Sequence, residues 1–301
     1  MASVRPIYLE EPCRTAINPV RGMMFEWSLN PYMGCAHRCT FCYVRAFEHR
    51  ADRPWDDQYG TVVRVKTNIA QVLACELERP SWEHGEVVIG AATDPYQPAE
   101  GRYRLTRACI RVLTAHRTPF SIITRGPLIV RDIDLLSEAA RKVEVGVSFS
   151  IPTLDPDVWR TTEPSTAPPE QRLRALRRLR EAGIDAGVAM APILPGLSDS
   201  PEGMAAVVRA ARAAGATAIW TELLHLRPGT REHYLAHLAR DWPEQLERYT
   251  KLYAGRAYLP DARRAAIKSQ LADIKKRIPA SGPALPVLAP PAEPEQLDLA
   301  I

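Results

Sequence analysis

The sequence lacks any long hydrophobic run and contains little lysine. No stretch approaches the roughly 18 uninterrupted apolar residues that a membrane span requires. The N-terminal segment carries two adjacent acidic residues and no apolar segment of the kind found in a secretory signal. Only six of the 39 basic residues are lysine, and 35 acidic residues leave a net charge of +4. This mild balance permits nucleic acid as a partner without indicating it.

Cysteine is also scarce. Six cysteines in 301 residues are too few for a secreted domain held together by disulfides. With 46% hydrophobic and 25% charged residues, the composition is that of an ordinary globular protein, which excludes collagen-like and wholly disordered chains. We therefore expect a cytoplasmic protein with reduced thiols and no membrane partner.

From about residue 60 the pattern alternates between short β-branched apolar runs and longer segments with helical periodicity. The expected strands are 27–31, 86–91, 120–124, 143–150, 184–191 and 216–221, and the expected helices between them are 67–78, 105–116, 131–141, 170–182 and 201–214. Strands that alternate with helices are typical of a parallel sheet with crossover helices. The prediction is an α/β fold, a partial (β/α)6 TIM-type barrel.

The rest of the chain divides into three further parts. Residues 1–24 form an N-terminal extension before the barrel at 25–229. Two more helices, 244–253 and 261–277, predict a C-terminal helical extension over 230–278. The proline-rich stretch 279–301 has too little apolar surface to offset the entropy of ordering, so we expect a flexible, disordered tail.

The strongest chemical signal is the spacing of Cys35, Cys39 and Cys42. On a continuous helix these positions would share one face, so a buried stripe of small residues is one interpretation. A structural zinc site is another, although zinc prefers four protein ligands and no second pair of cysteines exists. Cys13 is a conceivable fourth ligand without support from its neighbours. Three clustered thiols also suit an iron–sulfur cluster with one iron left open, because ordinary clusters use four cysteines.

The C-x3-C-x2-C spacing, with the aromatic Phe41 before the third cysteine, resembles the radical S-adenosylmethionine (SAM) superfamily. The resemblance implies a [4Fe–4S] cluster held by Cys35, Cys39 and Cys42, with SAM bound to the open iron. It also implies reductive cleavage of SAM to a 5′-deoxyadenosyl radical that abstracts hydrogen from a substrate. A flavodoxin-like or ferredoxin-like electron donor is then expected as a partner.

The string Thr93-Asp94-Pro95-Tyr96-Gln97-Pro98 is similar to one branch of this superfamily, the DNA-repair proteins related to spore photoproduct lyase. The resemblance covers roughly residues 25–277 and implies a set of cofactor contacts. Phe41 would lie against the adenine, Thr93 and Asp94 would meet the methionine ammonium, Arg125 its carboxylate, and Ser150 the methionine or ribose. Tyr43 matches a tyrosine of the radical relay in that branch.

One departure concerns the substrate. The lyase has a hydrogen-donating cysteine three positions before the aspartate, where this chain has Ala91. A nucleic-acid substrate is therefore one hypothesis, and a peptide, tRNA or small metabolite is another. A third is a non-catalytic zinc or iron–sulfur module recruited through its tail.

Two clusters of basic side chains and the C-terminal segment are the regions that suggest binding partners. Helix 170–182 carries five arginines, which we interpret as its solvated face. His225, Arg227, Arg231 and His233 follow the last strand, near the expected mouth of the barrel. Gln296, Leu297, Leu299 and Ile301 resemble the short peptides that dock on the bacterial sliding clamp, although a plain flexible end explains them as well.

Overall fold

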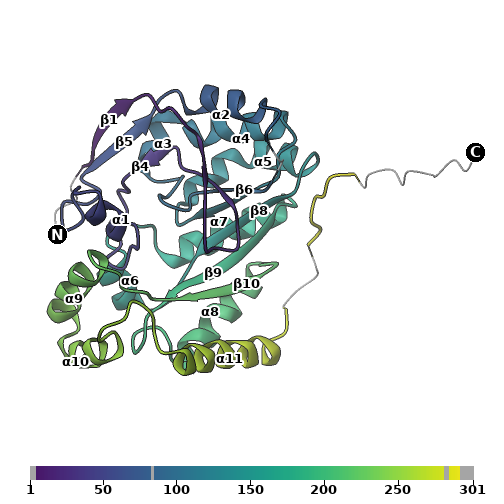
Figure 1. Cartoon of the computed structure of the whole chain (residues 1–301). Helices are drawn as coiled ribbons and strands as arrows, with labels where there is room; N and C mark the ends of the chain where they lie inside the picture. Colours follow the sequence, from purple (N-terminus) through teal and green to yellow (C-terminus); the bar gives the residue numbers. More distant parts are fainter. Residues whose placement is uncertain (1–4, 83–84, 281–284, 292–301) are drawn as a thin grey trace, which may run out of the picture.

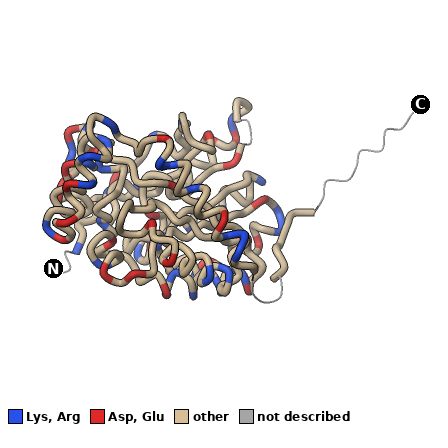
Figure 2. Tube along the Cα trace, turned by 90° about the horizontal axis from the view of Figure 1, so that it is seen from below, with Lys and Arg blue, Asp and Glu red and all other residues tan. Residues whose placement is uncertain are grey.

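The computed structural model describes residues 5–82, 85–280 and 285–291. The clamp-like segment from Gln296 to Ile301 lies outside these ranges. No helix among the described residues is long and apolar enough to cross a membrane. Basic and acidic residues are interspersed around this part of the chain (Figure 2).

One open sheet organises the molecule. Its seven strands have the order β10-β9-β8-β7-β6-β3-β2. They are β2 (Ile17–Pro19), β3 (Trp27–Leu29), β6 (Val87–Ile89), β7 (Phe120–Thr124), β8 (Val145–Ser150), β9 (Asp185–Ile193) and β10 (Ile219–Leu223). Neighbours from β3 to β10 are parallel, whereas β2 is antiparallel to β3. In the described residues β2 and β10 do not pair, so the sheet is a partial barrel, as predicted.

The six predicted strands are the six parallel strands. Strand β7 matches its predicted ends, and the others differ by up to three residues. Their side chains are largely buried because helices cover the sheet, and continuous apolar runs such as Val87–Ile89 are the expected sequence of such strands.

A second sheet was not predicted. It has the order β1-β5-β4 and consists of β1 (Ile7–Glu11), β5 (Val62–Lys66) and β4 (Tyr32–Met33). Strand β1 is mostly exposed and β4 has two residues, so neither has a clear periodicity. The small sheet packs closely against the start of the cysteine segment. Gly34, directly after β4, is so near β5 that a Cβ on it would lie 2.7 Å from the Val62 carbonyl oxygen.

The helices before β10 are α1 (Arg45–Arg50), α2 (Ile69–Leu77), α3 (Pro98–Tyr103), α4 (Leu105–Ala115), α5 (Ile133–Ala140), α6 (Pro156–Thr162), α7 (Pro169–Glu181) and α8 (Pro201–Ala213), with a 3-10 turn at Pro127–Asp132. After it come α9 (Thr230–Asp241), α10 (Pro243–Leu252) and α11 (Asp261–Arg277), which gather at one end of the molecule (Figure 1). All seven predicted helices are present within two residues of their expected ends. Helices α1, α3, α6 and α9 were not predicted.

Helix α7 corrects the interpretation of its arginines. Arg172 is fully buried and Arg180 is 3% exposed, so they do not belong to a solvated face. Arg180 donates to the carbonyls of Ile184 and Gly215 and, at 2.8 Å, to that of Leu285. The described part of the C-terminal segment is thus bonded to the barrel at this point.

Candidate functional site

The three cysteines lie in a loop between β4 and α1. Residues 35–42 form successive turns and no helix, so the interpretation as a helical stripe was wrong. Gly34 and Arg38 both have positive φ angles, which turn the loop back on itself. Cys35 and Cys39 are buried and Cys42 is half-buried. The loop follows β3, so it lies at the carboxyl edge of the parallel strands, where barrel enzymes place their chemistry.

Gln97 fixes the start of this loop. Its Oε1 accepts from the Ala36 N–H at 3.0 Å, and its Nε2 donates to the Gly34 carbonyl at 3.1 Å and to Thr93 Oγ1 at 2.9 Å. Thr93 in turn donates to the same Gly34 carbonyl at 2.8 Å. The segment after β6 is therefore bonded directly to the cysteine loop. Gln97 belongs to the motif that the sequence singled out, but it was not assigned a role.

Arg45 fixes the end of the loop. Its guanidinium is buried and donates to the carbonyls of Cys39 at 3.3 Å and Arg38 at 3.4 Å. It also donates to the carbonyls of Trp55 and Asp56. One side chain thus joins the cysteine loop to the following segment, a role that the sequence did not indicate.

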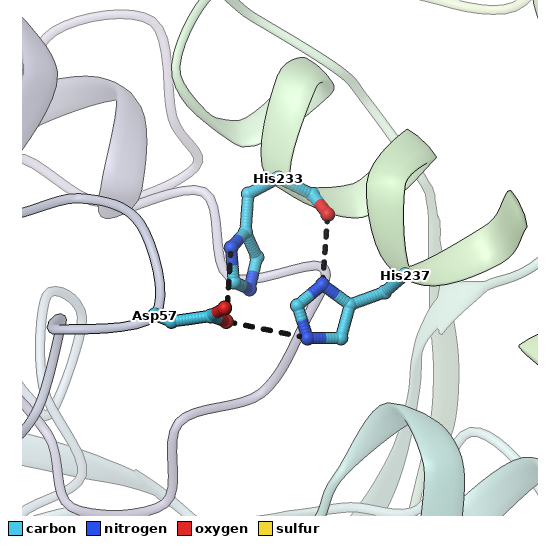
Figure 3. Close-up of side chains that lie close together, drawn as sticks. All are labelled: Asp57, His233 and His237. Atoms are coloured by element: carbon cyan, nitrogen blue, oxygen red, sulfur yellow. Dashed lines mark hydrogen bonds and ion pairs between the residues drawn. The ribbon is translucent and has the colours of Figure 1, made fainter. Parts of the chain in front are cut away.

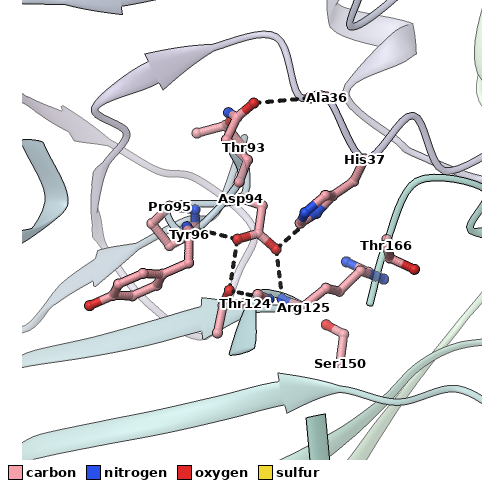
Figure 4. A network of polar contacts seen from close by, with 12 residues as sticks. Ala36, His37, Thr93, Asp94, Pro95, Tyr96, Thr124, Arg125, Ser150 and Thr166 are labelled. Carbon is pink, nitrogen blue, oxygen red and sulfur yellow. Dashed lines mark hydrogen bonds and ion pairs between the residues drawn. The ribbon is translucent and has the colours of Figure 1, made fainter. Parts of the chain in front are cut away.

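Asp94 is the centre of a polar network (Figure 4). Its Oδ1 accepts from Thr124 Oγ1 at 2.7 Å and from the Tyr96 N–H at 2.9 Å, and its Oδ2 accepts from the Arg125 N–H at 2.6 Å. His37 Nδ1 lies 3.3 Å from Oδ2. The network ties the ends of β6 and β7 to the cysteine loop.

The charges within this network stabilise each other. Burial alone raises the pKa of Asp94, but the His37 ring and the hydrogen bonds outweigh it and bring that pKa to about 2. Burial lowers the pKa of His37, but the charges of Asp94 and Cys35 outweigh it and raise that pKa to about 10. The two side chains therefore form a buried ion pair, in which Asp94 keeps a negative charge at the edge of the sheet.

Arg125 extends the network toward β9. Its Nε donates to Glu163 Oε1 at 3.0 Å, and its NH2 group donates to the Ala191 carbonyl at 3.1 Å. Its guanidinium lies 5.5 Å from the centre of the Phe41 ring. Glu163 is also bonded to the buried Arg172. Burial raises the pKa of Glu163, but the two arginines outweigh it and hold that pKa below its ordinary value.

Two other predicted residues lie at the same edge. Ser150 is the last residue of β8 and is buried, and its carbonyl accepts from Arg172 at 2.8 Å. The Tyr43 hydroxyl donates to the carbonyl of Ala91. The structure thus brings together, around one strand edge, every site residue that the sequence predicted.

The donor set suits a polynuclear metal group. Thiols bind metals as thiolates. Burial raises the pKa of Cys39 and Cys42, and the nearby Arg125 and Arg45 partly offset this effect. A structural zinc ion prefers four protein ligands, whereas three thiolates leave one position of an iron–sulfur cluster open.

The remaining cysteines lie elsewhere. The backbone N–H and carbonyl of Cys13 exchange hydrogen bonds with the Asn68 side chain at the start of α2. Cys75 is exposed, and Cys109 is packed in the core.

Comparison with known proteins identifies relatives of the whole barrel. The profile of the radical SAM superfamily matches residues 29–208. An uncharacterized protein of Mycobacterium tuberculosis is 40% identical over 282 residues, which cover 93% of this chain and 82% of that protein. An uncharacterized protein of Acidianus two-tailed virus is 31% identical over 224 residues, or 70% of this chain and 71% of that protein.

Two solved structures have the same fold. A mutant of spore photoproduct lyase superposes with a TM-score of 0.68 at 16% identity, covering 90% of this chain and 79% of that chain. Another mutant of that enzyme, with bound AdoMet and dinucleoside spore photoproduct, gives a TM-score of 0.66 at 15% identity and the same coverage. These likenesses confirm the predicted fold class.

Proposed function

The chain belongs to the radical SAM superfamily, and we propose that Cys35, Cys39 and Cys42 hold a [4Fe–4S] cluster that binds SAM at its open iron. Together the cluster and SAM would supply reductive cleavage of SAM to a 5′-deoxyadenosyl radical, which abstracts hydrogen from the substrate. The observation that carries the proposal is the isolated trio of thiols at the carboxyl edge of the parallel strands. A flavodoxin-like or ferredoxin-like protein would supply the electron.

The chain's own residues would bind and orient SAM. The negative charge of Asp94 suits the methionine ammonium, and Thr93 lies beside it in sequence with its hydroxyl bonded to the cysteine loop. The Arg125 guanidinium suits the methionine carboxylate. It would then bind two carboxylates, that of the methionine and that of Glu163. Ser150 would contact the methionine or ribose.

Phe41 and Tyr43 directly precede and follow Cys42 in the sequence. Phe41 is buried beneath the Arg125 guanidinium, where its ring would lie against the adenine. Tyr43 is half-buried and directed at the Ala91 carbonyl, so its phenol stands between the cysteine loop and the end of β6. We assign Tyr43 to the radical relay.

For the substrate we propose nucleic acid. A row of rings leads outward from the cysteine loop: Tyr43 and His225 are 5.8 Å apart, and His225 stacks on Tyr258 at 5.3 Å. Tyr258 is 45% exposed, and Arg227 donates to its hydroxyl at 3.0 Å. An exposed ring beside a guanidinium suits a base and its phosphate. The fold is also that of an enzyme solved with a dinucleoside.

The test is metal analysis after anaerobic purification and reconstitution. About four iron and four sulfide per chain are expected, together with reductant-dependent formation of 5′-deoxyadenosine from SAM. Cys39→Ala should abolish both, and Cys75→Ala, at an exposed cysteine, should change neither. One zinc per chain on the cysteines, or no 5′-deoxyadenosine, would contradict the proposal.

The substrate class is tested separately. Incubation of the reconstituted protein with a lesion-bearing oligonucleotide should consume the lesion and form a product that mass spectrometry can identify. Formation of 5′-deoxyadenosine without any change in the oligonucleotide would retain the radical chemistry and reject nucleic acid.

A further inference from the structure

A second group of ligating side chains lies behind the cysteine loop. Asp57, in the segment after α1, faces His233 and His237 on α9 (Figure 3). Asp57 Oδ1 is 3.4 Å from His237 Nε2 and 3.9 Å from His233 Nδ1, and one ligand atom from each residue lies within 4.8 Å of the others. The two histidines are four residues apart on one helix, so their rings project from the same face.

Within the described part of the chain, the His233 ring lacks hydrogen bonds that would explain its position. The side chain is 4% exposed, its Nδ1 is beyond hydrogen-bond reach of Asp57, and its Nε2 is buried with no partner among the described residues. Buried polar atoms are nearly always bonded, so each exception requires an explanation. A metal ion bound at Nε2 would provide one.

His237 is oriented as metal-binding histidines usually are. Its Nδ1 lies 3.0 Å from the His233 carbonyl oxygen, so the N–H on Nδ1 donates there and Nε2 faces Asp57. Metal-bound histidines typically donate their second N–H to a carbonyl or carboxylate in this way, which fixes the tautomer.

From this geometry we propose that Asp57, His233 and His237 form a binding site for a divalent transition metal, with Zn²⁺ as the best match. The 3.4 Å between Asp57 Oδ1 and His237 Nε2 suits a single ion with metal–ligand distances of about 2.0–2.2 Å, and a ring nitrogen of His233 lies within 4.8 Å of ligand atoms on both residues. Two imidazoles favour Zn²⁺ over Mg²⁺ or Ca²⁺, which prefer oxygen ligands. Asp57 is 78% exposed, so water can complete the coordination.

The ion would join two segments that both contact the cysteine loop. The Asp57 carbonyl accepts from Arg38, and the neighbouring Asp56 carbonyl accepts from Arg45. At the start of α9, Thr230 donates to the Cys42 carbonyl at 3.2 Å. The proposed zinc site is thus a structural brace for the cysteine loop, built from residues distinct from the cluster ligands.

The test uses the cluster-loaded protein and Zn²⁺ as the probe. We expect one Zn²⁺ per chain beyond the iron content, with X-ray absorption showing nitrogen and oxygen ligands at about 2.0–2.2 Å. Asp57→Ala and His237→Gln should each weaken Zn²⁺ binding at least about tenfold. Because Asp57 is exposed, its replacement should leave the protein folded.

His116→Gln, at the end of α4, is the matched control and should bind Zn²⁺ like the wild type. Sulfur ligands at the zinc, unchanged affinity in Asp57→Ala, or no bound zinc would each overturn the proposal. The outcome does not depend on the cluster chemistry, because iron content and 5′-deoxyadenosine formation are measured independently.

Discussion

The three cysteines and the group of Asp57, His233 and His237 are the two proposed metal sites, and their surroundings differ. The cysteines lie beside a network in which Asp94 and Arg125 have partners for their charges. Asp57 Oδ1 and His233 Nδ1, by contrast, lie 3.9 Å apart, beyond hydrogen-bond reach of each other.

The two regions differ in charge pairing: His37 Nδ1 and His233 Nε2 both lack a hydrogen bond among the described residues, but His37 lies 3.3 Å from the buried Asp94, whereas His233 faces the exposed Asp57 at 3.9 Å. Paired buried charges can position a cofactor, and the unpaired ring is where a ligand can complete a site.

The largest expected effect comes from breaking the satisfied network. Arg172→Ala removes one of the two guanidiniums that hold the buried Glu163, and loss of a buried charge partner costs about 3–5 kcal/mol. Thr162, the neighbour of Glu163, accepts from the Thr40 N–H through its carbonyl, so the cysteine loop should loosen as well. Denaturant unfolding measures the loss of stability.

Arg174→Ala is the control, because Arg174 is exposed on the same helix and should change stability by about 0.5 kcal/mol or less. Equal effects of the two substitutions would show that the buried arginine contributes no more than an exposed one.

The second prediction concerns cofactor binding at the same network. Asp94→Ala removes the carboxylate proposed to meet the methionine ammonium, and a hydrogen bond to a charged group contributes about 1.5–3 kcal/mol. SAM affinity should therefore fall at least about tenfold, measured by calorimetry on reconstituted samples matched for iron content. Unfolding is measured alongside, because Asp94→Ala also removes the partner of the buried His37. Asp273→Ala, at an exposed position on α11, is the control. Wild-type affinity in Asp94→Ala would exclude the assigned contact.

The sequence predicted the first region far better than the second. The parallel strands are local apolar runs, and the polar residues Asp94, Arg125 and Ser150 follow or end three of them, so one sheet edge gathers them. Asp57 and His233 are far apart in the chain and have no shared periodicity. Their proximity depends on how α9 packs behind the cysteine loop, which local pattern does not determine.

Arg172 is an intermediate case. It precedes Leu176 by four residues and Leu179 by seven, so helical periodicity places it on the buried face of α7. The signal was present, but arginine is rarely buried unless paired. Its partner Glu163 lies in the preceding loop, and their pairing required the tertiary structure.

The third prediction extends the comparison to the exposed end of the ring series. Tyr258→Ala removes the outermost ring, and stacking of one base on an aromatic side chain contributes about 1–3 kcal/mol. Affinity for a short single-stranded oligonucleotide should therefore fall about tenfold, as measured by fluorescence anisotropy. Tyr103→Ala, on α3, should bind normally. If both variants bind like the wild type, Tyr258 is not a base-stacking residue.

The smallest expected effect is at the unsatisfied site, in the presence of a chelator. Without metal, Asp57→Ala should change the free energy of unfolding by no more than about 0.5 kcal/mol, because the carboxylate is exposed and its loss leaves no buried group unpaired. With free Zn²⁺ at about 100 times its dissociation constant, the wild type should gain about 2.7 kcal/mol, and the variant should gain much less. A large loss of stability in the chelated variant would mean that Asp57 stabilises α9 directly. The different stability effects at Asp57 and at the Asp94 network would then reflect only that Asp57 is exposed and the network is buried.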